Sequence, residues 1–112
     1  MPAYVIARVD ISNPEQYATY TARTPREVAK FGGRFIVRTA DVLTVEGPAE
    51  TRRVVVIEFP SLEQAKAFYF SDGYEAVKAR RAGAAEGQFI IVDGYPESAW
   101  ASVLAASQAV AD

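Results

Sequence analysis

Arginine and tyrosine are the residue types through which this chain could bind or transform a small molecule. The 112 residues include no histidine and no cysteine, so imidazole acid–base chemistry, His- or Cys-ligated metals and thiol nucleophiles are excluded. Arg34 and Arg38 are four residues apart on a predicted strand and are therefore expected on the same face of it, and Arg53 begins the next predicted strand. An arginine on a covered sheet face needs an anion or a carbonyl as its partner. The pattern therefore favours a pocket for the carboxylate or enolate of a small organic molecule.

The same arginines have a second interpretation, in which none of them binds a ligand. Each would pair with an acidic side chain of the protein or lie at a sheet edge. Acidic side chains that could serve are Glu46, Glu58 and Asp41. A pocket of roughly 300 Å³ or more, lined by arginine and phenol, would support the ligand site. A solid core with every arginine paired to an acid would support the alternative.

A third candidate arginine lies on the second predicted helix. Tyr74, Val77 and Arg81 are spaced i, i+3 and i+7, so Arg81 shares a helical face with two residues of core type. Such an arginine either clamps a ligand or satisfies a helix end while its guanidinium reaches solvent. In a ligand site, the anion would be held by Arg34, Arg53 and Arg81. Tyr17 or Tyr74 would donate a hydrogen bond, and Glu46 would be the carboxylate base because no histidine can serve.

Charge and composition argue against several other classes of function. The 12 basic and 14 acidic residues give a net charge of −2, so neither nucleic acid nor an anionic membrane is an expected partner. The carboxylates lack the spacing of a calcium loop, and Gly32-Gly33 ends a helix rather than opening a phosphate-binding loop. No segment reaches the roughly 18–20 apolar residues of a membrane span. We expect a cytoplasmic protein that needs neither metal nor cofactor.

Hydrophobic periodicity and helix caps predict one α+β domain over residues 1–96. Both helices begin with a capping box, Asn13 with Gln16 and Ser61 with Gln64. Pro25 is expected to bend or split the first helix. The predicted elements are strand 3–11, helix 14–31, strand 34–39 resuming over 42–46, strand 53–59, a helix from 62 to 81 interrupted at 71–73, and strand 88–95. This β-α-β-β-α-β order is that of a ferredoxin-like sandwich.

Residues 97–112 form a separate piece, which we expect to be an extra C-terminal helical arm. One face of the predicted helix carries Trp100, Val103, Leu104, Ser107 and Ala111. The segment contains no lysine or arginine, which argues against a helix lying on a membrane surface. We therefore expect the arm to dock its Trp100 face on its own domain or on a neighbouring molecule.

The strands predict a second copy of the chain. Val54 and Val56 lie on one face of the strand over 53–59, whereas Val55 and Ile57 lie on the other. The first and last strands are also apolar on both faces, although two helices cover only one face of a four-stranded sheet. The economical cover for the second face is the same face of another copy, related by a two-fold axis. We therefore expect a homodimer packed sheet to sheet, with the C-terminal arm as the alternative cover.

The sequence also resembles a known family. The blocks that carry the resemblance are residues 13–17, 31–35, 46–47 and 53–61, followed by Ala65, Ala67, Tyr69, Ser71, Tyr74 and Arg81. Together they span residues 3–95 and are similar to the DUF1330 family of the dimeric α+β barrel superfamily. The resemblance implies ferredoxin-like protomers that pair sheet to sheet, and it carries no established activity. The chain departs from the family pattern at Asp72-Gly73, where Pro-Glu is usual, and in the arm after residue 96.

Two hypotheses for the function follow. In the first, a cofactor-free cleft binds or transforms a small oxygenated organic acid or a phenolic compound, as the resemblance to mono-oxygenase and isomerase members of the superfamily implies. In the second, the chain is a non-catalytic stress-type or scaffold dimer without a ligand site. The sequence does not say whether the protein is an enzyme.

Overall fold

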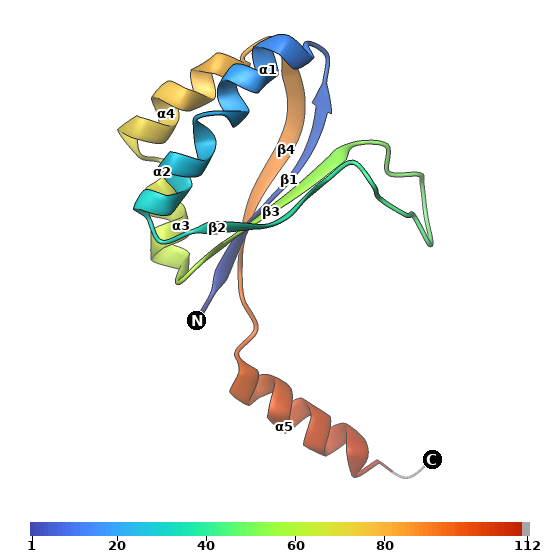
Figure 1. The fold of residues 1–112 in the computed structure, drawn as a ribbon. Coiled ribbons are helices and arrows are strands. Elements are labelled where there is room, and N and C mark those ends of the chain that lie inside the picture. The colour runs from blue at the N-terminus through green and yellow to red at the C-terminus, as the bar shows by residue number, and fades with distance from the viewer. Residues whose placement is uncertain (111–112) are drawn as a thin grey trace.

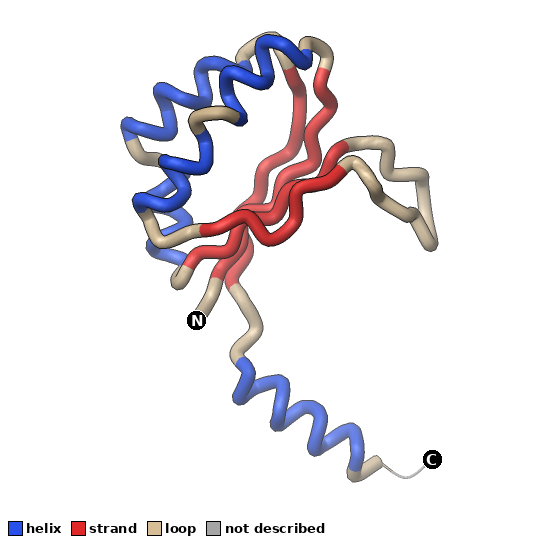
Figure 2. The backbone as a smooth tube through the Cα atoms, in the orientation of Figure 1, coloured by secondary structure: helices blue, strands red, loops and turns tan. Residues whose placement is uncertain are grey.

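The chain folds into a four-stranded antiparallel sheet with helices packed on one of its faces (Figure 1 and Figure 2). The computed structural model describes residues 1–110. The strands are β1 (Ala3–Ile11), β2 (Arg34–Thr39), β3 (Arg53–Phe59) and β4 (Ala85–Asp93), in the sheet order β2-β3-β1-β4. The helices are α1 (Pro14–Thr21), α2 (Thr24–Lys30), α3 (Leu62–Tyr69), α4 (Asp72–Lys78) and α5 (Glu97–Gln108), with a 3-10 turn (Ala79–Arg81) after α4. The predicted ferredoxin-like α+β order is confirmed.

The hydrogen bonds at the helix caps confirm the expected helix starts. Asn13 Oδ1 accepts a hydrogen bond from the backbone N–H of Gln16 at 3.2 Å, and Ser61 Oγ accepts one from the N–H of Gln64 at 3.2 Å. Pro25 lies in the first turn of α2, where the missing proline N–H leaves no intrahelical bond unmade. The first predicted helix is therefore split into α1 and α2.

The register of β2 corrects one expectation. A bulge lies between Phe35 and Val37, so that Arg34 pairs with Glu58 whereas Arg38 pairs with Val55. An extra residue in one strand shifts the alternation by one, and every later side chain changes face. The expected shared face of Arg34 and Arg38 is therefore wrong: Arg38 faces the helices and Arg34 faces the opposite side of the sheet.

The expected continuation of this strand over residues 42–46 is also wrong, because residues 40–52 form a loop without regular structure. Side chains bind the loop backbone in place of a partner strand. Thr39 Oγ1 accepts a hydrogen bond from the N–H of Asp41 at 2.9 Å, and Thr44 Oγ1 accepts one from the N–H of Glu50 at 2.8 Å. Such local bonds compete with a strand ladder, which is why β2 ends at Thr39.

The core lies between the sheet and helices α1 to α4. Alternate residues of β1 and β3 point toward the helices and are buried, while their neighbours point to the other face. The largest buried side chains, Phe59, Phe68 and Tyr74, bring their rings together, with centroids of Phe68 and Tyr74 4.5 Å apart. Aromatic burial of this size dominates the stability of a small domain.

The second face of the sheet has no helix over it, as Figure 1 shows. Across its middle runs a row of apolar side chains, one from each strand. In register order these are Val37, Val56, Ile6 and Ile90. Each is partly exposed in a single protomer. We refer to this surface as the open face.

Helix α5 stands away from the sheet and from the other helices (Figure 1). Its apolar residues Trp100, Val103 and Leu104 are exposed. Of the two expected docking sites for this helix, its own domain is not used in the structure. Docking on a neighbouring molecule stays a prediction, as does the division into a domain and an arm at residue 96. Ala111 of the predicted stripe lies outside the described residues. Within residues 1–110, no helix has the length and apolar character needed to cross a bilayer. A cytoplasmic location stays a prediction.

Gly33→Ala is expected to destabilise the fold by about 1–3 kcal/mol, because overpacking strains a filled core. A Cβ at this position would lie 2.5 Å from Cε1 of Phe59, whose ring is fully buried against that of Phe68. Urea unfolding measures the loss. If the clash is the cause, the same substitution in a Phe59→Leu background costs clearly less, because the ring edge is gone. An equal cost in both backgrounds would contradict the explanation.

Candidate functional site

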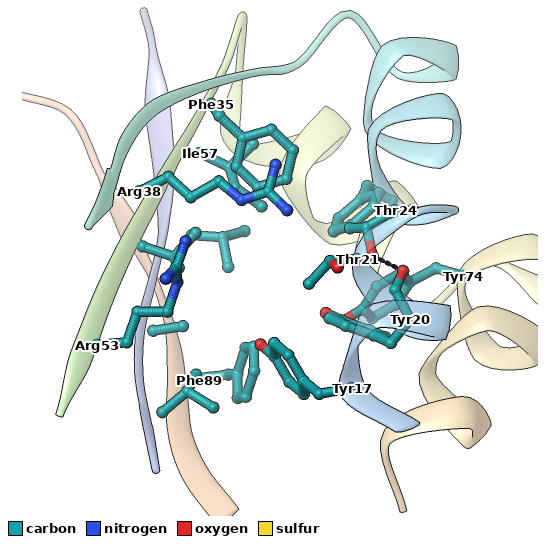
Figure 3. A pocket seen from close by; sticks show the side chains of 15 residues that line it. Tyr17, Tyr20, Thr21, Thr24, Phe35, Arg38, Arg53, Ile57, Tyr74 and Phe89 are labelled. Carbon is teal, nitrogen blue, oxygen red and sulfur yellow. Dashed lines mark hydrogen bonds between the residues drawn. The ribbon is translucent and has the colours of Figure 1, made fainter. Parts of the chain in front are cut away.

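A narrow pocket lies between the sheet and helices α1 and α2 (Figure 3). Its total open space is about 490 Å³, but the volume of its inner cavity is only about 30 Å³. That inner space holds roughly two water molecules. The residues that give the pocket its chemistry are Tyr17, Tyr20, Thr21, Arg38, Arg53 and Tyr74. The enclosed part is thus an aromatic slot, far smaller than the roughly 300 Å³ expected of a ligand pocket.

A wider hollow at the surface supplies most of the room. This outer hollow has a volume of about 250 Å³, and Pro14 and Ala18 of α1 form part of its wall. Arg38, Arg53 and Tyr17 line both this outer hollow and the inner slot. The two spaces are therefore neighbours, with the guanidinium groups at the passage between them.

Arg38 and Arg53 come from adjacent strands and lie on the sheet side of the pocket, opposite Tyr17 and Thr21 (Figure 3). The Arg38 guanidinium lies 4.9 Å from the centroid of the Phe35 ring. Within the described part of the chain, no carboxylate lies within 4.0 Å of either arginine's nitrogen atoms. Two unpaired cations beside an aromatic slot attract an anion.

The other arginines of the sheet do have acidic partners. Arg34 binds Glu58 at 3.2 Å on the open face, and Arg8 and Arg52 both bind Glu50 at 3.4 and 3.0 Å. The alternative in which each arginine pairs with an acidic side chain of the protein therefore holds for these three arginines. It does not hold for Arg38 and Arg53, which line the pocket.

Three phenols form the helical wall of the pocket. The hydroxyls of Tyr20 and Tyr74 are 2.7 Å apart in a buried hydrogen bond, and the rings of Tyr17 and Tyr20 are 5.3 Å apart. Burial raises the pKa of Tyr74 well above its usual value, the nearby phenol of Tyr20 raises it further, and Arg81 offsets part of the rise. Burial likewise raises the pKa of Tyr17. The phenols of Tyr17 and Tyr74 are therefore neutral near pH 7, so they can donate a hydrogen bond but cannot act as bases.

Arg81 lies behind the phenols rather than in the pocket wall. Its guanidinium carbon is 4.3 Å from the ring centroid of Phe89 and 5.3 Å from that of Tyr20. Its Nε is buried and has no hydrogen-bond partner among residues 1–110. Its effect on the pocket is therefore indirect, through contact with the rings and through its positive charge.

Besides Arg81, two more predicted site residues lie outside the pocket. Arg34 is on the open face, and Glu46 is exposed in the loop over residues 40–52. Among the described residues that line the slot, none carries a carboxylate. The arrangement can therefore bind an anion and donate hydrogen bonds to it, but the slot contains no protein group suited to general-base catalysis.

Tyr17, Tyr74 and Arg53 are the predicted site residues that the structure brings into one pocket. The sequence interpretation misplaced Arg38 and missed Thr21. Arg38 could have been assigned to this side only by recognising the bulge at Phe35–Val37, for which the sequence gives no turn residue as a signal. Thr21 was missed because the last turn of α1 carries no distinguishing motif.

The sheet order, the helices on one face and the pocket between them define a ferredoxin-like α+β protein. The chain belongs to the DUF1330 family, a domain of unknown function, whose family model matches residues 2–95. No curated protein matches the chain.

Solved structures share this fold at low sequence identity. RPA0582 from Rhodopseudomonas palustris, a protein of unknown function, has a TM-score of 0.67 at 19% identity and covers 85% of this chain and 83% of its own. SnoaB from Streptomyces nogalater, described as a cofactor-independent oxygenase, has a TM-score of 0.60 at 14% identity, covering 85% and 94%. A putative antibiotic biosynthesis monooxygenase from Caulobacter crescentus has a TM-score of 0.54 at 17% identity, and the match covers 85% of this chain and 91% of that protein.

Stability is expected to fall as the pH rises above about 10, and Tyr74 contributes to this dependence. Above that pH the unfolded chain releases the Tyr74 proton, whereas the folded protein retains it because burial raises its pKa. The unfolded state then binds fewer protons, so the free energy of unfolding falls by up to about 1.4 kcal/mol per pH unit for this group. Urea unfolding at several alkaline pH values measures the slope. Tyr74→Phe should reduce the slope, whereas Tyr95→Phe, at an exposed site, should leave it unchanged.

Proposed function

We propose that the pocket binds a small organic anion, a carboxylate or phenolate attached to a flat apolar group, without a bound cofactor. The observation that carries this proposal is the position of Arg38 and Arg53, two cations without an acidic partner, at the entrance to an aromatic slot. A guanidinium that has no protein anion nearby gains more from a ligand anion than one that is already paired.

The ligand would lie across both spaces. Its anionic group would sit in the outer hollow against the two guanidinium groups, where Tyr17 and Thr21 present hydroxyls. Its flat apolar part would lie at the mouth of the slot, against the rings of the helical wall and Phe89. No more than the edge of a ring would enter the slot, because the inner space holds only about two water molecules. This shape favours an aromatic or conjugated acid over a branched aliphatic one.

A transformation within this pocket would proceed through charge stabilisation. Two nearby cations lower the pKa of a bound phenol or carbon acid, because they favour its anion. With no carboxylate in the slot, the proton would leave to water in the outer hollow. SnoaB, described as a cofactor-independent oxygenase, shares this fold at 14% identity, which supports a small-molecule function without supplying a substrate.

A non-catalytic dimer without a ligand is the second candidate function. The narrowness of the slot favours it, since about 30 Å³ of inner space is close to that of a packed core. In this case Arg38 and Arg53 would be solvated at the surface and the open face would be the functional surface.

Both candidates include a homodimer formed through the open face. The row of apolar side chains across that face is uncovered in a protomer, and monomers rarely expose a contiguous apolar patch of more than a few hundred Å². The same face of a second copy, related by a two-fold axis, covers the row in both protomers.

Calorimetric titration of the full chain with sodium benzoate and with benzyl alcohol tests the ligand site. The two probes share a ring and differ in charge. We expect benzoate to bind at least about tenfold more tightly, because each charge-assisted hydrogen bond contributes about 1.5–3 kcal/mol. Equal binding of the two probes, or no binding of benzoate at millimolar concentration, would favour the dimer without a ligand.

A further inference from the structure

Helix α5 carries an apolar stripe that nothing covers in the protomer. Trp100 is 54% exposed, Val103 50% and Leu104 37%, and all three lie on one side of the helix. Figure 2 shows the helix separated from the sheet by the connection that follows β4. The start of this connection is fixed, because the N–H of Gly94 donates a 2.8 Å hydrogen bond to the carbonyl of Pro2. The sheet therefore determines where the helix begins.

The loop over residues 40–52 carries the second uncovered apolar projection. Leu43 is 84% exposed and Val45 is 83% exposed, values close to those of an unfolded chain. Figure 1 shows this loop extending from the sheet on the side away from α1 to α4. Loops rarely expose two large apolar side chains unless a partner covers them.

The loop and α5 lie at opposite ends of the sheet. The loop leads into Arg53, which pairs with Val9 near the end of β1, whereas α5 follows Asp93, which pairs with Ala3 at the start of β1. A strand of nine residues spans about 30 Å. The loop and the helix of one chain therefore start about 30 Å apart and do not touch in the structure.

We propose that α5 of each protomer packs its apolar stripe on the loop over residues 40–52 of a second copy of this chain. This inference rests on the proposed dimer through the open face. A two-fold axis that lies between the facing sheets and runs across the strands reverses the strand direction. The α5 end of one protomer then lies over the loop end of its partner, and the contact occurs twice in each dimer.

The chemistry of the two surfaces fits a second copy of this chain as the partner of α5. Over residues 97–110 the only charged side chain is Glu97, in the first turn of α5. The helix therefore has no cationic side chains on the face opposite the apolar stripe. A helix that binds a lipid surface usually has a cationic polar face, and this one does not. An apolar stripe on α5 fits a loop that exposes Leu43 and Val45, and in the proposed dimer the same chain brings the two together.

Disulfide trapping tests the contact directly, because the natural chain has no cysteine. We expect the double variant Val45→Cys/Val103→Cys to form a covalent dimer on mild oxidation, seen on a non-reducing gel. A disulfide requires Cα atoms within about 7 Å, so the two positions cannot join within one chain. The matched control is Val45→Cys/Ser102→Cys, since Ser102 lies on the opposite side of α5. It should form at least tenfold less covalent dimer.

Two measurements on the unmodified chain separate failure of the contact from failure of the dimer. Sedimentation gives the mass, and acrylamide quenching of Trp100, the single tryptophan, gives its exposure. A dimer with a shielded Trp100 supports the inference. A dimer with a fully quenched Trp100 and no trapped disulfide overturns the contact and leaves the dimer standing. A monomer at micromolar concentration overturns both.

Discussion

Val56→Asp is expected to convert the dimer into folded monomers. Val56 lies in the middle of the open face, opposite Ile6 on β1 and Val37 on β2. A two-fold axis buries the new carboxylate in both protomers, and a buried charge without a partner costs several kcal/mol. We expect the dissociation constant to rise by at least about 1,000-fold, measured by sedimentation over a range of concentrations.

The size of this effect follows from the symmetry of the interface. A typical interface buries about 800 Å² per partner, so an interface over the open face covers Val56 at its middle. The two-fold axis then buries two unpaired carboxylates in each dimer, and each opposes association by several kcal/mol.

The control for Val56→Asp is Ala67→Asp, which adds the same charge at an exposed position of α3, away from the open face. It should leave the dimer intact. Circular dichroism of both variants checks that the fold is retained, which is expected because Val56 does not belong to the buried core. An unchanged mass of Val56→Asp would show that the open face is not the dimer interface.

The parts of the fold that depend on neighbouring residues could be predicted from the sequence. Asn13 and Ser61 fix the helix starts through bonds to residues three positions later, and Pro25 separates α1 from α2. The two-sided apolar pattern of β3 predicts a second apolar face, and the structure shows that this face carries Val54 and Val56. These signals are local, so a single sequence contains them.

The parts that depend on strand pairing could not be predicted in the same way. The bulge in β2 arises from its register with β3, and this register alone decides that Arg38 faces the pocket while Arg34 binds Glu58. The parity rule applied to the sequence assumes an uninterrupted strand. Arg53 lies on the same face as Val55 and Ile57, as uninterrupted alternation along β3 predicts, because no irregularity lies between these residues.

The charge of the pocket is the feature on which the proposed function depends, and Arg38→Leu/Arg53→Leu removes it. We expect this double variant to lose benzoate binding by at least about 100-fold, because each guanidinium supplies a charge-assisted bond of about 1.5–3 kcal/mol to the anion. Stability should change little, since neither arginine has an acidic partner within the described residues. Calorimetric titration measures the affinity, and urea unfolding checks the stability.

The matched control is Arg26→Leu/Arg80→Leu, which changes the net charge by the same amount at two exposed positions outside the pocket. If binding depended only on the overall field of the protein, both double variants would weaken it equally. If Arg38 and Arg53 bind the anion directly, the control retains its affinity and each single variant loses roughly tenfold or more. Added salt should then weaken benzoate binding to the natural chain more than to either single variant. The natural chain has two guanidinium groups for salt to screen, whereas each single variant has one. Equal losses in the two double variants would contradict a site at the entrance of the slot.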